Sequence, residues 1–518
     1  MGRLVARVIA CAVLFIVLPV SGAQAAGDDD TRLLEAAKHR DAKAVAALLP
    51  AANVNATQPD GATALHWAAH WDDLGLVQLL IRAKANVNAA NDLGVTPLLV
   101  ACADASPAVV TALLDAGADA KTKMPSGETA LMMASRTGRA ETVRALLLHG
   151  ADVNARDTAR QQTALMWAVA ERHAGVVRLL IESGADVHAP SASRPRVGFI
   201  AGNRNGTGHS PESILANSRE FDDGGYTALL LAAREDDAES AKLLLKAGAR
   251  VDDMAASGAS ALLVAVHSDS PNVATLLLEA GADPNADGAG YTPLQAAVLR
   301  GNLDVVKALL ARGAQPNARI TNPTPARRYG NEYVFGEHLV GTTPFYLAAK
   351  FGELDIMRAL AAAGADTRAQ GADGSTAIML ALDTPATRTG NAEGFGTDRR
   401  DRYGLVTAVT PDQVEGDALS IAKLAIELGG DVNQTDRDGN TALHLAASKG
   451  FNRVIQLLAD NGAALNARNR KGQTALAAAE AATAVGAARR RMTGANQRVS
   501  DETASSTVAL LRRLGASK

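Results

Sequence analysis

A short phrase recurs along the 518-residue chain: Thr or Ser, then Ala or Pro, then Leu or another large apolar residue. Most copies start 32 to 34 residues apart, and three intervals are longer, at 64, 51 and 65 residues. A period of about 33 residues is typical of arrays that stack one supersecondary unit, because a single unit cannot bury its own apolar face. The copies begin at Thr63, Thr96, Thr129, Thr163, Thr227, Ser260, Thr292, Thr343, Thr376, Thr441 and Thr474.

Each unit carries the signals of two short helices. Thr suits a helix N-terminus, and Pro97, Pro293 and Pro344 follow it at a first helical position, where a missing N–H costs little. Paired alanines such as Ala68-Ala69 allow neighbouring helices to approach closely. A second apolar stripe ends at the closing phrase Gly150–Asn154, whose Gly suits a left-handed C-terminal cap.

Together the opening and closing phrases resemble the ankyrin repeat family, whose unit is a turn followed by two antiparallel helices. The resemblance spans about Thr31 to Lys518. It implies an all-α ankyrin-repeat solenoid of about twelve helix-turn-helix units. We expect residues 33–49 and 503–514 to form the terminal helices, and residues 26–518 to form a single solenoid.

The first 25 residues have the layout of a secretory signal peptide. Two arginines precede the apolar run Val8–Val20, and Ala23-Gln24-Ala25 fits a cleavage site for small residues. A run of about 13 residues is too short to cross a hydrocarbon core of roughly 30 Å comfortably. We therefore expect residues 1–25 to be removed; an uncleaved anchor is the alternative.

Charge and cysteine content indicate the class of partner. The formal charge is -3, and removal of Arg3 and Arg7 makes it about -5 by subtraction of 2. This near-balance argues against nucleic acid or an anionic membrane as the partner. Only Cys102 follows the signal peptide, so stability has to come from packing rather than from an internal disulfide. We expect a soluble monomer without stable membrane insertion, whose partner is another protein.

The three long intervals hold three insertions, at residues 190–221, 320–340 and 385–416. They are rich in Gly, Pro, Asn and Arg, a composition that predicts loops. Long loops in compact proteins are commonly functional or disordered, so binding by an insertion and a tolerated surface excursion both remain open. We expect the outer helix after the third insertion to begin near Asp417.

The resemblance to ankyrin binders implies a recognition surface made of variable inner-helix positions on the concave side, the finger tips and the insertions. Charged and aromatic side chains are mixed at these positions, which favours a protein interface over a small-molecule cavity. The candidate binding residues are His70, Trp71, Glu128, Arg136, Glu171, Arg196, Phe199, Tyr226, Arg234, Arg300 and Phe351.

Catalytic and metal-binding patterns are not recognisable. His66 and His70 have a spacing that two zinc ligands use, but no third ligand follows in a known pattern. We expect His66 and His444 to form structural hydrogen bonds, and Cys102 to be a small buried apolar residue. We expect no cofactor, no metal and no enzymatic activity.

The leading interpretation is a protein-binding scaffold in the periplasm of a Gram-negative bacterium, because an export signal precedes the Ala-rich repeat array. A secreted factor that binds a host or extracellular protein is the main alternative. An enzyme or ligand-binding protein whose insertions build the site is a third class, which needs convergent polar residues.

Overall fold

The protein is described here by a computed structural model. It describes residues 27–104, 106–200, 218–323, 325–326, 339–382, 398–400, 406–408, 410–482 and 499–517. The expected signal peptide at residues 1–25 lies outside the described residues.

The chain divides into two compact units. Unit 1 comprises Met1–Arg194 and Asp222–Ala256, and unit 2 comprises Pro195–Phe221 and Ser257–Lys518. The expectation of a single solenoid over residues 26–518 stays a prediction.

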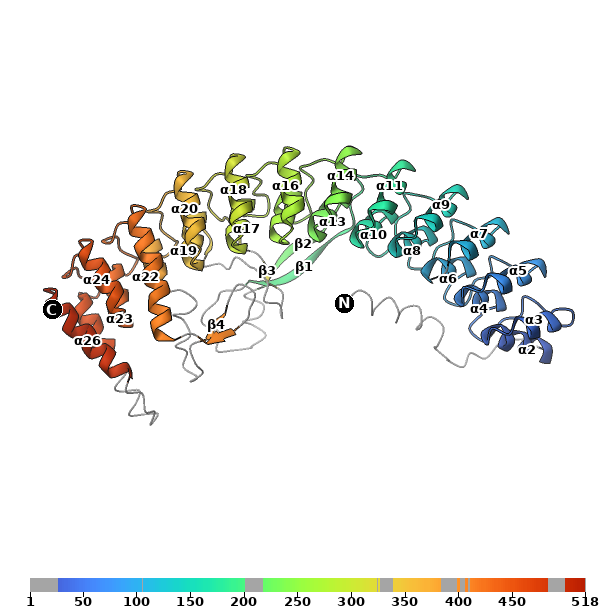
Figure 1. Cartoon of the computed structure of the whole chain (residues 1–518), viewed down its shortest axis with the longest axis horizontal. Coiled ribbons are helices and arrows are strands. Elements are labelled where there is room, and N and C mark those ends of the chain that lie inside the picture. The colour runs from blue at the N-terminus through green and yellow to red at the C-terminus, as the bar shows by residue number, and fades with distance from the viewer. Residues whose placement is uncertain are drawn as a thin grey trace. The chain divides into compact units, whose positions relative to one another are not determined.

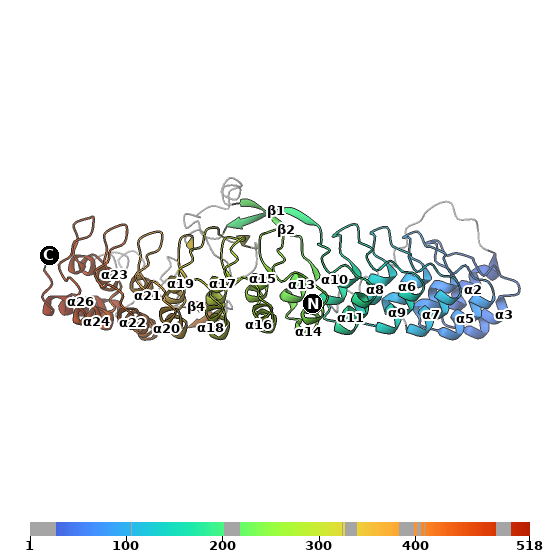
Figure 2. The ribbon, with the colours of Figure 1, turned by 90° about the horizontal axis from the view of Figure 1, so that it is seen from above.

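Unit 1 is a series of antiparallel helix pairs, each with an inner helix followed by an outer helix. Figure 2 shows the inner helices α6, α8 and α10 in one row and the outer helices α7, α9 and α11 in another. The pairs are α2 (Asp28–Lys38) with α3 (Ala42–Leu48), α4 (Ala64–His70) with α5 (Leu74–Arg82), α6 (Pro97–Asp104) with α7 (Pro107–Asp115), α8 (Ala130–Thr137) with α9 (Ala140–Leu148), α10 (Ala164–Ala170) with α11 (Ala174–Glu182), and α13 (Ala228–Glu235) with α14 (Ala238–Lys246).

Unit 2 repeats the same element (Figure 1). Its pairs are α15 (Ala261–His267) with α16 (Pro271–Glu279), α17 (Pro293–Arg300) with α18 (Leu303–Ala311), α19 (Pro344–Phe351) with α20 (Leu354–Ala362), α21 (Ala377–Ala381) with α22 (Pro411–Glu427), α23 (Ala442–Lys449) with α24 (Asn452–Asp460), and helical residues 475–482 with α26 (Val499–Arg513). The described residues thus hold twelve pairs, which confirms the all-α repeat array. No helix among them is long and apolar enough to cross a membrane.

The inner helices of the repeats that carry the recurring phrase begin at its Thr or Ser residue, as expected. The Thr129 hydroxyl accepts a hydrogen bond from the Met132 backbone N–H at 3.2 Å, and Ser260 does the same for Leu263. This satisfies donors that an isolated helix start leaves unpaired. Ala232 and Ala233 on α13 are fully buried, as expected for side chains that let helices pack closely.

A row of asparagines joins the turns of successive repeats. The Asn285 side chain accepts a hydrogen bond from Gln315 N–H at 2.7 Å and donates one to the Gly313 carbonyl at 3.0 Å. The same two bonds recur at Asn88, Asn154, Asn317 and Asn433. Each asparagine therefore satisfies backbone groups of the next repeat.

We expect Asn285→Ala to lower the free energy of unfolding by about 1–2 kcal/mol, because two hydrogen bonds between repeats are lost. Asn461→Ala is the control, since its amide bonds only to Leu457 within its own helix. Urea unfolding followed by circular dichroism measures both variants. Equal losses for the two variants would contradict a special role for the contacts between repeats.

The insertions contain strands that the composition did not predict. Strands β1 (Ser193–Ile200), β2 (Ser218–Gly224) and β3 (Pro325–Ala326) form a sheet in the order β2-β1-β3. Phe199 pairs with Ala326, so the first and second insertions are joined by backbone hydrogen bonds. The third insertion contains the antiparallel pair β4 (Asp398–Arg400) and β5 (Val406–Ala408). The prediction of loops is wrong for these residues, because strand pairing depends on tertiary neighbours that composition does not reveal.

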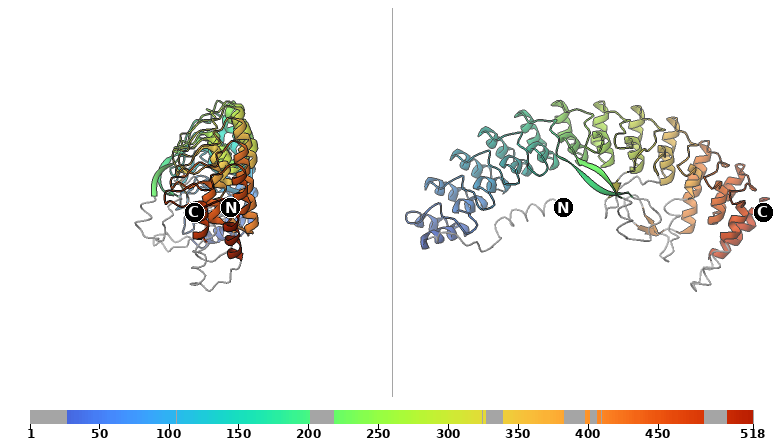
Figure 3. Two further views of the ribbon diagram at one scale, coloured as in Figure 1. Left: turned by 90° about the vertical axis from the view of Figure 1, so that its left-hand side faces the viewer. Right: turned by 180° about the vertical axis from the view of Figure 1, so that it is seen from behind.

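The outer helix after the third insertion begins at Pro411, not near Asp417. Thr410 and Gln413 cap it reciprocally: the Thr410 hydroxyl accepts from the Gln413 backbone N–H, and the side-chain amide oxygen Oε1 of Gln413 accepts from the Thr410 backbone N–H at 2.8 Å. The predicted boundary at Gly416 was therefore too late, since it came from the repeat period and overlooked this capping box. The resulting α22 has 17 residues and α24 has 9, a difference that Figure 3 makes plain for the orange helix.

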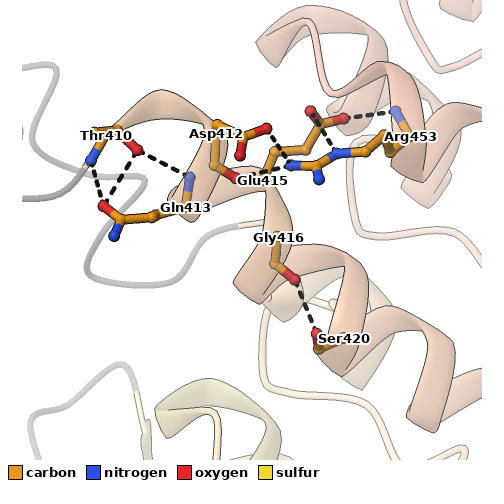
Figure 4. Close-up of polar contacts among 7 residues, drawn as sticks. All are labelled: Thr410, Asp412, Gln413, Glu415, Gly416, Ser420 and Arg453. Atoms are coloured by element: carbon orange, nitrogen blue, oxygen red, sulfur yellow. Dashed lines mark hydrogen bonds and ion pairs between the residues drawn. The ribbon is translucent and has the colours of Figure 1, made fainter.

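A polar clamp holds the added turns of α22 against α24 (Figure 4). The Glu415 carboxylate accepts from the Arg453 backbone N–H at 2.6 Å and from its Nε at 3.3 Å. The Arg453 guanidinium also contacts the Asp412 carboxylate at 2.8 Å. Glu415 thus caps a helix of the next repeat, which fixes the point where the third insertion returns to the array.

Candidate functional site

The candidate inner-helix residues lie where each inner helix ends and turns towards its outer helix. We call His70, Trp71, Arg136, Glu171 and Arg234 the inner-helix strip of unit 1; Arg300 and Phe351 hold corresponding positions in unit 2. Each follows a segment whose small side chains are buried, such as Ala68 and Ala69 before His70. The backbone of the strip is therefore held by helix packing.

Trp71 is the most strongly positioned aromatic side chain of the strip. Its indole N–H donates to the Lys38 carbonyl of the preceding repeat at 3.0 Å. The His70 ring lies 4.8 Å away, and the Arg40 guanidinium lies 5.8 Å from the indole centroid. The side chain is nevertheless 37% exposed. Trp71 is thus an exposed aromatic residue whose orientation is fixed before any partner arrives.

Arg136 has a similar arrangement two repeats further along. Its guanidinium lies 5.3 Å from the ring centroid of Trp167, which the next inner helix supplies. Its backbone carbonyl contacts His173 Nε2 at 3.0 Å. Both Arg136 and Trp167 are half-buried. The guanidinium is therefore held over an aromatic face at the surface.

The remaining unit 1 candidates form one pair and two separate positions. Arg234 lies 5.6 Å over the Tyr226 ring and makes an ion pair with Glu235 at 2.8 Å. Glu171 is exposed at the C-terminal cap of α10. Glu128 is half-buried in a finger, where its carbonyl accepts from Met124 N–H. The structure therefore joins Tyr226 with Arg234, and His70 with Trp71.

The unit 2 candidates lie in different surroundings. Arg300 donates to the His267 carbonyl, and His267 Nδ1 lies 3.3 Å from the Tyr291 hydroxyl. Burial lowers the pKa of His267 to about 4, and the positive charge of Arg300 contributes. A neutral His267 therefore belongs to a polar cluster that packs α15 against α17. Phe351 is half-buried at the end of α19.

The two candidates of the first insertion are on β1, in the part that belongs to unit 2. The Arg196 side chain is exposed. Phe199 pairs through its backbone with Ala326, and its side chain lies outside what the structure describes. A role of either residue in binding stays a prediction.

Sequence reasoning missed Lys38, Arg40 and Trp167. Lys38 Nζ lies 5.8 Å from the Trp67 ring centroid, so three cations of unit 1 lie over tryptophans. A signal was available, because Trp67 and Trp167 occupy the same position of the recurring phrase. The cations over them could not be predicted, since they come from the preceding repeat.

His66 and His444 form the expected structural hydrogen bonds. In His66, Nδ1 accepts from Thr63 N–H at 3.1 Å, and Nε2 contacts the Val95 carbonyl of the next repeat at 2.9 Å. His444 makes the same contacts with Thr441 and Gln473. Burial lowers the pKa of His66, which favours the neutral ring. Both ring nitrogens of each histidine therefore make hydrogen-bond contacts within the repeat array.

Cys102 is buried, with 2% of its surface exposed, as expected for a small apolar residue. Burial raises the pKa of its thiol far above the usual range. The nucleophilic thiolate is therefore scarce at neutral pH.

Comparison with known families decides the identification. A family model described as ankyrin repeats (3 copies) matches residues 33–124, 104–191, 229–320 and 409–489, which together cover more than half of the chain. The chain belongs to the ankyrin-repeat family. Ankyrin repeats generally mediate protein–protein interaction, and members of the family are typically non-catalytic scaffolds. The histidine and asparagine hydrogen bonds described above thus connect neighbouring repeats of an ankyrin-repeat array.

Proposed function

We propose that this ankyrin-repeat protein is a protein-binding scaffold that acts in the periplasm through its inner-helix strip, finger tips and insertions. The N-terminal sequence supports export, since a short apolar run precedes a site of small residues. Fractionation of the producing cells separates this location from secretion into the medium, which a factor that binds an extracellular protein requires.

The observation that carries the proposal is the fixed and exposed indole of Trp71. Interface residues with large contributions to affinity are enriched in Trp, Tyr and Arg. A side chain that is already ordered loses little conformational entropy on binding. Trp71 meets both conditions, and Arg40 and His70 extend the surface around it.

The test is capture of a partner by the chain from residue 26 onwards, followed by affinity measurement with the purified partner. We expect Trp71→Ala to weaken binding at least tenfold, because loss of a central anchor commonly costs about 2 kcal/mol or more. Leu148→Ala is the matched control, since Leu148 is 79% exposed at the end of the outer helix α9.

We expect the control to bind as the unchanged protein does, and both variants to keep the helical circular dichroism signal. Full affinity of a folded Trp71→Ala variant would contradict binding through the strip.

A further inference from the structure

Two arginines of unit 1 lie over tryptophans and have no carboxylate partner within the described residues. They are Arg40, over Trp71 at 5.8 Å, and Arg136, over Trp167 at 5.3 Å. The other cations nearby are engaged: Lys38 pairs with Glu35 at 3.6 Å, Arg234 with Glu235 at 2.8 Å, and Arg172 donates to the Asp236 carbonyl at 3.1 Å.

The acidic residues around this surface are mostly engaged as well. Glu35 contacts Lys38 and His39, and Glu235 contacts Arg234. One carboxylate oxygen of Asp72 accepts from both the N–H and the hydroxyl of Ser106, each at 2.8 Å. Glu171 is exposed at the end of α10. Neither Arg40 nor Arg136 forms an ion pair with these carboxylates within the described residues.

The backbone of Arg40 adopts a conformation that favours glycine. Its φ is 58°, in the left-handed region, and the equivalent position of a later repeat is Gly138 with a φ of 75°. A side chain is unfavourable there compared with glycine. Asp72, Arg172, Asp236 and Asp269 share this position and a positive φ, and the side chains of Asp72 and Arg172 bond to the adjacent repeat. Arg40 makes no such bond within the described residues, and its guanidinium lies over Trp71 alone.

A guanidinium over an aromatic ring that has no carboxylate partner retains N–H donors, and these donors match a carboxylate bidentately. Attraction to the ring also restricts the motion of the guanidinium before binding. We infer that this surface binds an extended protein segment that carries Asp or Glu side chains, with one acidic position at Arg40 and another at Arg136. The inference rests on the proposed function and specifies the partner of its surface.

The spacing of the two arginines sets the length of the segment. Helices α2, α4, α6 and α8 contact one another in succession, so three helix spacings separate the two sites. At about 8–10 Å per spacing, this distance is roughly 24–30 Å. An extended chain covers it with about eight residues at roughly 3.3 Å per residue.

The probe is a fluorescent peptide with two Glu pairs separated by a Gly-Ser spacer of about eight residues. The matched peptide has Gln in place of each Glu, and a single-stranded oligothymidylate supplies phosphate charge instead. Fluorescence anisotropy with the chain from residue 26 onwards gives the affinities. We expect the Glu peptide to bind at least tenfold more tightly than the Gln peptide and the oligonucleotide, and to weaken as salt increases.

Arg40→Gly combined with Arg136→Gln is expected to weaken binding of the Glu peptide at least tenfold. The control is Arg82→Gln combined with Arg178→Gln, which makes the same change of charge on exposed positions of the outer helices α5 and α11. We expect the control to bind like the unchanged protein. Arg40→Gly alone should weaken binding without lowering the melting temperature, because glycine suits its backbone.

Equal binding of the Glu and Gln peptides, tighter binding of the oligonucleotide, or equal losses in both double variants would overturn the inference. The proposed function fails separately. If binding of a captured partner depends on Trp71 but not on Arg40 and Arg136, the scaffold function stands and the acidic segment is rejected. If Trp71→Ala binds the partner with full affinity, the proposed binding surface is rejected.

Discussion

Phe345→Ala is expected to lower the free energy of unfolding by about 3–5 kcal/mol, the usual range for removing a buried aromatic side chain. Phe345 is 1% exposed and belongs to the largest fully buried side chains of the described residues. It lies on α19, which packs against both α17 and α21. The cavity therefore weakens two repeat interfaces within unit 2.

Phe351→Ala is the matched control, because it removes the same side chain from a half-buried position at the end of the same helix. We expect it to cost less than about 1.5 kcal/mol. Urea unfolding followed by circular dichroism measures both variants. Similar losses would show that the register of α19 is wrong.

Acidification from pH 6.5 to about 4 is expected to destabilise unit 2 through His267. Burial and the charge of Arg300 lower the pKa of His267 from 6.5 to about 4 in the folded protein. Over this interval the unfolded chain binds a proton that the folded chain does not, so stability is present above pH 6.5 and is lost as the pH falls towards 4. The loss is at most about 3 kcal/mol, at 1.36 kcal/mol for each pKa unit.

The measurement compares unfolding free energies at pH 7 and pH 4 for the unchanged protein and for His267→Gln. We expect a smaller pH dependence in the variant, because the titrating ring is absent. His39→Gln is the control, since this side chain is 73% exposed at the end of the first inner helix. An unchanged pH dependence in His267→Gln would contradict burial of a neutral His267.

The helical framework could be predicted because its signals are local and repeated. Thr129 caps its helix, Pro293 occupies a first helical position and Gly150 has a φ of 87°, as their places in the repeat indicate. The structural bonds of His66 followed from its place in the recurring phrase. These features recur because every helix pair has to bury its apolar face against the neighbouring pairs.

The features specific to this chain could not be predicted, since they depend on residues far apart in sequence. The pairing of Phe199 with Ala326 joins two insertions that are more than a hundred residues apart. The guanidinium of Arg136 meets Trp167, an aromatic residue of the next repeat. Trp71 was identified from its variable position, but its bond to the Lys38 carbonyl was not. The start of α22 at Pro411 was locally encoded and was overlooked.

The central claim is that a partner protein binds the inner-helix strip of unit 1. The most direct test places a photocrosslinking amino acid at His70, beside Trp71, or at Arg178, an exposed position on the outer helix α11. Crosslinking is carried out in the producing cells, and adducts are identified by mass spectrometry. The account predicts one defined protein adduct from position 70 and none from position 178. The same adduct from both positions, or an adduct from position 178 alone, would contradict it.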